Sequence, residues 1–423
     1  MDISGVHEGK KNQVLYFLAL VLYCLNFRGE GMFIPFLLLP FLVMHLAFHR
    51  FNVRYFIIVG IIIVFSTIYS LTMNSYGYIY SSFNFYSYLL YPVCLFMLGE
   101  LLARKDGGNK KLTYNTIFGV IFSFALFSVL SLMKTINTYG SIEAATRALN
   151  GRVVLNFWND SLISATGFNT YLSFGLVILP ICFMSFKELR YGKALKFLCF
   201  LSFLISLYGI IILANRTGFI LILASLIAVS LLVKKTTFLR VVKWFVGILS
   251  VMFIKFLYDN NMDIKYFLLQ YPLFSRFNEM DMRNDPRFES WKEAFMGLFT
   301  NPTGGRKTSL SLNYAHNMWL DVGYDVGILS FFLLLLITFL GLSALYNFIK
   351  SNQPLLLKGL IVGLYTAMFL TFMVEPIFEG WFTYFTVFCF VFGLTHGLNF
   401  KYRIDRNNNI QRASDTNYET TPF

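Results

Sequence analysis

The sequence has few charged residues. Only 13% of its 423 residues are Asp, Glu, Lys or Arg, whereas soluble domains carry roughly 25%. The charges also cluster and leave long apolar runs between them, which excludes an ordinary soluble protein and predicts a polytopic integral membrane protein. The formal net charge of +13 would favour nucleic-acid binding in a soluble chain. Here it is typical of Lys and Arg marking cytoplasmic loops, and no DNA- or RNA-binding motif is present.

Cysteine and histidine are also scarce, with five of each. No CxxC pair occurs and every cysteine lies in an apolar run, so we expect neither structural disulfides nor a zinc site. No compact group of His, Cys, Asp and Glu has the spacing of a metal site. Metal binding is therefore disfavoured, and we expect no cofactor. The cysteines are Cys24, Cys94, Cys182, Cys199 and Cys389.

Apolar runs, in contrast, are abundant. A membrane core needs roughly 17–25 residues per helix, and about twelve runs approach this length, so we expect about twelve transmembrane helices in one domain over residues 1–400. Lys10 and Lys11 precede the first run as in a signal peptide, but no small-residue cleavage site follows, so we expect a retained helix. The expected spans are 12–27, 32–49, 55–73, 84–103, 113–133, 161–186, 194–214, 217–233, 241–258, 317–347, 356–374 and 381–400.

The positive charges predict the orientation. With the N-terminus inside, most Lys and Arg outside one long loop fall on cytoplasmic segments, as the positive-inside rule requires. An even number of spans then places both termini in the cytoplasm. The polar stretch "RNNNIQRASDTNYETTPF" is typical of disorder, so we expect residues 401–423 to form a disordered cytoplasmic tail.

Two loops on the opposite, outer side are long, at about 134–160 and about 258–316. The second is far longer than usual between bundled helices, which indicates a function or independent folding. Within it, "DPRFESWKEAFMGLF" has Asp285 as a cap and Pro286 in a first turn. We expect a short amphipathic helix lying on the membrane surface. Its apolar face is Phe288, Trp291, Phe295, Leu298 and Phe299.

Arginines on this outer side are candidate anion ligands. Arg216 lies in the short turn "LANRTGF" between two apolar runs. It either snorkels at a helix end or holds a phosphate in a bidentate fork. Arg283 and Arg287 lie before and within the amphipathic helix, and taken alone they read as solvated loop charges paired with nearby acids. Weaker candidates of the same kind are Arg147, Arg152, Arg276, Arg306 and Lys307.

The stretch "HNMWLDVGYDVG" opens the span after the long loop. His316 is the only histidine on the outer side, and an imidazole suits general-base chemistry. The plain alternative is a His–Asn pair that caps the helix, with Asn317 as the cap. Asp321 and Asp325 are four residues apart and share a helix face. Gly323 and Gly327 form a GxxxG pair that favours close packing with another helix.

Three of these elements occur in the order of a known family: "NRTG", "RFESWKEAFMGLFTNPTGG" and "HNMWLDVGYDVG". Together they resemble the O-antigen polymerase and ligase superfamily of bacterial cell envelopes. The resemblance covers roughly residues 205–335 and implies a membrane glycosyltransferase of the type C kind, with an outward-facing site. One departure is "PTGGR", where the family usually has a G-x-G after the proline, and this leaves the loop geometry and any role of Arg306 open.

The resemblance also implies roles for individual residues. Arg216, and less firmly Arg287, match arginines at the donor diphosphate, and His316 matches the histidine that deprotonates the acceptor hydroxyl. Asn317, Asp321 and Arg283 are candidates for orienting the base or binding the acceptor. The implied donor and acceptor are oligosaccharides linked to undecaprenyl diphosphate in the bacterial inner membrane, and the implied site is periplasmic.

We therefore expect an O-antigen polymerase that inverts the anomeric centre without a metal. An O-antigen ligase, which transfers the glycan to lipid A–core, breaks the same bond and is the first alternative. A lipid-linked-oligosaccharide flippase is the alternative from another class, but it would be expected to show internal repeats and ionisable residues at mid-membrane, and we find no repeat. Expected partners are the lipid-linked sugars, membrane lipid and, as a candidate, a chain-length regulator protein; none is a nucleic acid.

Overall fold

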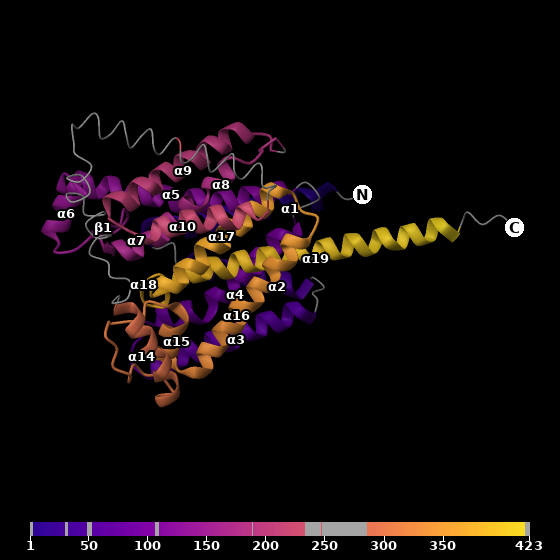
Figure 1. Ribbon diagram of the computed structural model, residues 1–423. Coiled ribbons are helices and arrows are strands. Elements are labelled where there is room, and N and C mark those ends of the chain that lie inside the picture. The colour runs from indigo at the N-terminus through magenta and orange to yellow at the C-terminus, as the bar shows by residue number, and fades with distance from the viewer. Residues whose placement is uncertain are drawn as a thin grey trace.

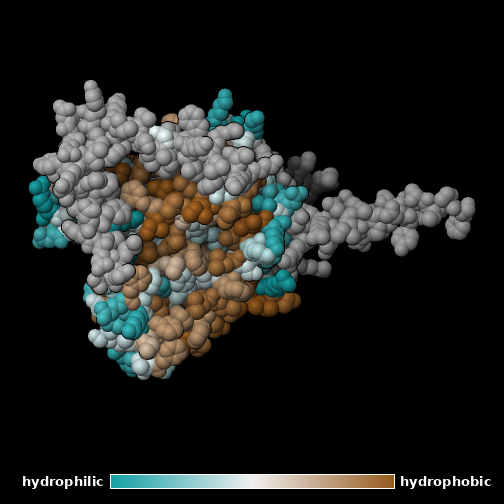
Figure 2. Space-filling model, viewed as in Figure 1, coloured by the Kyte–Doolittle hydropathy of each residue, from teal (hydrophilic) through white to brown (hydrophobic). Residues whose placement is uncertain are grey.

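The computed structural model describes residues 3–29, 33–48, 53–105, 110–187, 189–232, 247 and 286–418. In this part of the chain, eight helices are long and apolar enough to cross a membrane, and three shorter apolar helices accompany them. Figure 2 shows a broad apolar band between polar ends. The protein is therefore an all-α, multi-pass membrane protein. The long spans are 53–75, 82–104, 111–139, 165–182, 192–212, 328–350, 355–374 and 382–400; the shorter helices are 13–24, 34–44 and 217–230.

Almost all regular structure is helical, apart from one two-stranded antiparallel hairpin. The elements up to the hairpin are α1 (Ile3–Cys24), the 3-10 turn η1 (Phe27–Gly29), α2 (Ile34–Phe48), α3 (Val53–Ser75), α4 (Ser82–Lys105), α5 (Lys111–Tyr139), α6 (Ile142–Ala148), β1 (Val153–Leu155) and β2 (Leu162–Ser164). Those after it are α7 (Ala165–Val177), α8 (Leu179–Cys182), α9 (Gly192–Ile212), α10 (Thr217–Ser230), α14 (Pro286–Thr300), α15 (Met318–Val326), α16 (Ile328–Lys350), α17 (Leu355–Val374), α18 (Ile377–Gly380) and α19 (Phe382–Tyr418).

Most expected spans coincide with an apolar helix at nearly the expected bounds. Apart from residue 247, the expected span at 241–258 lies outside the described residues, and so does the first part of the long loop expected at about 258–316, up to residue 285. A total of about twelve spans therefore stays a prediction. The five cysteines are all free and buried.

The expected span 317–347 is wrong as a single helix. It is two helices, α15 and α16, which meet at Gly327. This glycine has φ 96°, and a side chain there would collide with the backbone of Pro302 and Thr303. Hydropathy does not reveal this break, because it measures only how apolar a segment is. The glycine is required because the backbone of Pro302 and Thr303 packs against it.

The segment expected as a loop at about 134–160 contains regular structure. Helix α5 continues to Tyr139, because no breaker occurs before Gly140, which ends it with φ 81°. Helix α6 and the β1–β2 hairpin occupy the rest.

The tail also differs from expectation. α19 continues as one helix to Tyr418, where disorder was predicted from residue 401. The segment 401–418 contains no Gly or Pro, so nothing in it stops a helix that the membrane span has already nucleated.

The elements gather at two ends of the bundle. Figure 1 shows α6, β1, α14, α15 and α18 at one end, here named the site end. α1 begins and α19 finishes at the opposite end, here named the terminal end. Two contacts agree with this view: the Trp158 indole N–H, near the hairpin, donates to the carbonyl of Leu25 just after α1 (2.9 Å), and Gly167 near the start of α7 packs against Trp381.

Helices α4 and α19 form the closest pair in the bundle core. Gly99 lies against the Phe390 carbonyl and Gly393 against the Phe96 carbonyl, so a Cβ at either position would meet backbone atoms. These two glycines allow the axes to approach, as small residues do in membrane helix pairs.

We expect Gly393→Leu to disrupt this pair and greatly reduce the amount of folded protein, because overpacking against backbone typically costs about 1–3 kcal/mol and the backbone cannot yield as a flexible side chain can. Gly60→Leu in α3 is the matched control, since a Cβ there meets nothing within 4 Å. Size-exclusion profiles and thermal unfolding in detergent measure both variants. Equal behaviour of the two would contradict the packing described.

Candidate functional site

His316 lies in a short turn that leads into α15. Its backbone is in the left-handed region, with φ 54°. Asn317 is the N-cap of α15: its side chain accepts from the Leu320 N–H (3.2 Å), which confirms the capping role considered from the sequence. The histidine is thus held at the mouth of a well-capped helix, half-buried.

Asp321 fixes the backbone around the histidine. Its carboxylate is fully buried and accepts from the backbone N–H groups of Ala315 (2.8 Å) and Asn317 (3.0 Å), with the His316 N–H as a further donor. Burial and the neighbouring Asp325 raise the pKa of Asp321, while the three backbone N–H groups oppose the rise. Asp321 therefore positions the turn through its backbone, and sequence spacing alone could not show this.

Arg306 is the centre of a polar cluster at the site end, here named the clasp. Its guanidinium donates to Asp325 (2.8 Å) and to Glu379, and lies over the Tyr78 ring, 4.2 Å from its centroid. The Tyr314 hydroxyl donates to the other oxygen of Glu379 (3.1 Å). The clasp joins the loop after α14, the end of α15, α18 and the α3–α4 loop, so Arg306, one of the weaker candidates from the sequence, has a structural role.

The clasp determines the charge state of Asp325. Burial raises the pKa of Asp325 to about 6, against the opposing charge and hydrogen bond of Arg306. Although burial alone would lower the pKa of Arg306, the charge and hydrogen bond of Asp325 raise it. The arginine therefore stays charged and holds the acid as an ion pair.

The "PTGGR" turn fits into the break between α15 and α16. Gly304 and Gly305 have φ 71° and 78°, which only glycine adopts without strain. The Gly305 N–H donates to the Asp325 carbonyl (2.9 Å), and the Ile328 N–H donates to the Pro302 carbonyl (2.9 Å). The second glycine of the expected GxxxG pair is thus part of this junction, while Gly323 packs against Leu298 of α14.

Arg216 lies at the turn between α9 and α10, at the N-cap position of α10, and is half-buried. The turn is tightly held: the Asn215 side chain donates to the Ala165 carbonyl (3.2 Å) and accepts from the Thr217 N–H (3.1 Å). Arg152 donates to the two carbonyls that follow α9, those of Leu213 (3.0 Å) and Ala214 (3.1 Å). Arg152 thus stabilises the backbone of the turn, and Arg216 is carried by the turn itself.

Arg287 is the second residue of α14 and is half-buried. Its charge acts on Glu375, the residue that ends α17. Glu375 is fully buried and is absent from the residues predicted from the sequence. The signal that could have found it is a lone acid at the end of an apolar run, which marks a functional candidate in a membrane protein.

Helix α17 connects the candidate residues. α10, which begins after Arg216, and α15, which follows His316, both pack against α17. Arg287 acts on Glu375 at the end of α17. Each of the three predicted residues thus lies on or beside an element that packs against α17 or acts on its last residue.

Helix α14 confirms the predicted short helix, and its two faces carry different kinds of residue. The residues packed inward are small or aliphatic: Ser290, Ala294, Gly297 and Leu298. Phe288, Phe295 and Phe299 are exposed. An exposed aromatic face suits the membrane–water interface, and a place there stays a prediction.

Two predicted candidates and one predicted cap are not placed at all. Arg283, Arg276 and Asp285 lie outside the described residues. Within the described ranges, no group of three or more His, Cys, Asp and Glu side chains has an arrangement for a metal ion. The expectation of a metal-independent reaction stays a prediction.

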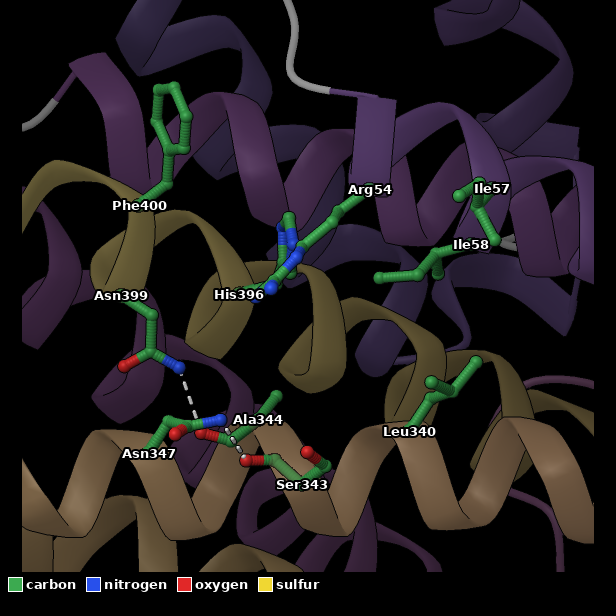
Figure 3. Close-up of a pocket in the computed structure, with 10 residues that line it drawn as sticks. All are labelled: Arg54, Ile57, Ile58, Leu340, Ser343, Ala344, Asn347, His396, Asn399 and Phe400. Atoms are coloured by element: carbon green, nitrogen blue, oxygen red, sulfur yellow. Dashed lines mark hydrogen bonds between the residues drawn. The ribbon is translucent and has the colours of Figure 1, made fainter. Parts of the chain in front are cut away.

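An open cavity of about 280 Å³ lies near the terminal end, between α3, α16 and α19. Figure 3 shows Arg54 and His396 on one side of it and Asn347 and Ser343 on the other. The His396 ring bonds to Glu100 (2.8 Å), which also pairs with Arg104 (2.7 Å). None of the predicted site residues lines this cavity, so it is separate from the site end.

No protein-family model matches this sequence, and a search of curated proteins finds no match to it. The function proposed below therefore depends on the chain's own residues, their motifs and their arrangement.

We expect Arg306→Met to lower the free energy of unfolding by about 3 kcal/mol, because it leaves the buried Asp325 carboxylate without its counter-charge. Adding Asp325→Asn should recover part of this loss, since the uncompensated charge is then removed. Thermal unfolding of the two single variants and the double variant in detergent gives the coupling. A double variant no more stable than Arg306→Met would count against the ion pair.

Proposed function

We propose that this protein is an O-antigen polymerase of the bacterial inner membrane. It would transfer a growing glycan from undecaprenyl diphosphate to a sugar hydroxyl of a lipid-linked repeat unit at the periplasmic face. The observation that supports the proposal is that α10, which follows Arg216, and α15, which follows His316, both pack against α17, and that the charge of Arg287 acts on Glu375 at the end of this helix. All of these elements belong to a multi-pass membrane protein. The ordered motifs that resemble the O-antigen polymerase and ligase superfamily support it.

The proposed reaction is a direct displacement. The acceptor hydroxyl oxygen bonds to C1 of the donor sugar, the bond from C1 to the diphosphate oxygen breaks, and the electron pair leaves with the diphosphate, so the anomeric centre inverts. Arg216 and Arg287 supply positive charge where negative charge grows on the leaving group. His316 accepts the proton of the attacking hydroxyl.

The local structure supports these roles. A general base must be held within hydrogen-bond reach of the proton it removes, and Asp321 and Asn317 fix the backbone on either side of His316. A side chain that binds the diphosphate should project from a rigid part of the backbone, and the turn that carries Arg216 is held in place by Asn215 and Arg152. Asp321, a candidate for orienting the base, acts on the backbone of the turn.

An O-antigen ligase is the alternative within the same chemistry, because it breaks the same sugar–diphosphate bond and differs in its acceptor. A flippase is the alternative of another class. It is disfavoured because the candidate residues gather at one end of the bundle, whereas transporters place their sites near mid-membrane.

Deleting the gene distinguishes these functions by lipopolysaccharide gel banding. A polymerase deletion should leave core carrying a single repeat unit, because ligation continues without chain growth. Core alone, with lipid-linked polymer accumulating, would identify a ligase instead. An unchanged ladder would overturn both.

Single variants test the site. His316→Ala should reduce polymer formation by about 10²–10⁴-fold, the usual contribution of a general base, and Arg216→Ala or Arg287→Ala by about 10²–10³-fold through lost stabilisation of the leaving group. The variants are compared at equal protein levels by gel banding and by the rate of polymer formation in membranes. The matched control is Lys292→Ala, which removes an exposed cation from α14. A full ladder from His316→Ala would exclude the general-base role.

A further inference from the structure

Glu375 is a buried carboxylate that accepts no hydrogen bond from the described part of the chain. It is fully buried, and neither of its two carboxylate oxygens has a hydrogen-bond partner there. Burying a charged group without partners is costly, and burial raises the pKa of Glu375 to about 7, with the charge of Arg287 acting against the rise. An apolar residue would avoid this cost, so the carboxylate indicates a ligand.

The position of Glu375 is rigid. Its backbone N–H donates to the Thr371 carbonyl (3.0 Å) at the end of α17, and Pro376 follows it and restricts the backbone. Glu379, one turn further on, provides the contrast because both of its oxygens are used, by Arg306 and by Tyr314. Glu379 is therefore part of the clasp, whereas both carboxylate oxygens of Glu375 can still accept hydrogen bonds.

The chemistry of the Arg287–Glu375 pair selects a type of ligand. A guanidinium only donates hydrogen bonds, and an ionised carboxylate only accepts them. A phosphate can satisfy Arg287, but it cannot satisfy the ionised form of Glu375, because a phosphate is itself negatively charged and only accepts. Sugar hydroxyls can, because they donate. The pair therefore suits a molecule in which hydroxyls lie directly beside a phosphate.

We infer that Glu375 binds the hydroxyls of the sugar that is attached to the donor diphosphate, next to the phosphate held by Arg287. The inference rests on the proposed function and deepens it: the site recognises a glycosyl diphosphate as one unit, with Arg287 for its phosphate and Glu375 for its first sugar. The two residues thus distinguish a loaded donor from the bare lipid diphosphate that the reaction leaves behind.

The test compares two ligands on the full-length protein in nanodiscs: bare undecaprenyl diphosphate and undecaprenyl diphosphate carrying the oligosaccharide repeat. Glu375→Gln should weaken binding of the glycosylated ligand about 10- to 100-fold, the usual value of hydrogen bonds to a charged group, and leave bare undecaprenyl diphosphate unchanged. Arg287→Ala should weaken both. Glu289→Gln, an exposed acid on α14 close to Arg287 in sequence, is the matched control and should change neither.

The outcomes separate this inference from the proposed function. The role of Glu375 would be overturned if Glu375→Gln bound both ligands as tightly as wild type does, or if it lost the same factor of affinity for both ligands. The proposed function would stand in either case. Failure of wild type to bind either ligand would overturn the proposed function, and the inference with it. Thermal unfolding of each variant identifies misfolding, and Glu375→Asp, which keeps the charge, should bind better than Glu375→Gln if the carboxylate itself is required.

Discussion

The ion pairs of Arg306 with Asp325 and Glu379 are the interaction on which the site end depends. A helix that breaks at Gly327 leaves backbone groups without partners, and in a membrane protein such groups need partners from the protein itself. The "PTGGR" turn supplies them, through the Gly305 N–H and the Pro302 carbonyl. Arg306 secures that turn to three other segments, so the break, the turn and the ion pairs form one unit.

This unit determines what α15 can do. The clasp fixes the last turn of α15, and at the other end of this helix Asn317 and Asp321 hold the backbone around His316. The acids that look available for chemistry in the sequence are therefore mostly structural. Asp321 accepts backbone N–H groups, while Asp325 and Glu379 neutralise one arginine. Glu375 differs from all three, since it has a neighbouring charge but no hydrogen-bond partner among the described residues.

Local features of the site could be predicted from sequence, and long-range ones could not. The apolar runs predict most spans because their length and hydropathy are properties of the run itself, and Asn317 is recognisable as a cap because capping involves residues three apart. The clasp joins Arg306 to Tyr78 and Glu379, which are distant in sequence, so no spacing rule could find it. The small residues that α14 packs inward could not be predicted for a related reason: their neighbours are distant in sequence, as Thr308 is for Gly297 and Gly323 is for Leu298.

The arrangement also indicates where a polymerase and a ligase would differ. Both reactions break the bond between a sugar and a diphosphate, so the residues that serve the donor would be common to both: Arg216, Arg287 and, on our inference, Glu375. His316 would also be common, because each acceptor loses a hydroxyl proton. The two enzymes would therefore differ in the surface that the acceptor contacts as it approaches. At the site end, this surface includes the exposed aromatic residues of α14. A lipid-linked acceptor and a lipid A–core acceptor differ in the size and position of their lipid anchors. Helix α14 carries Arg287 and is expected at the membrane surface, so on the proposed function it would be well placed to discriminate between them. The position of the acceptor relative to the membrane, set by α14, would then decide which acceptor is used. The same catalytic residues would serve a polymerase and a ligase.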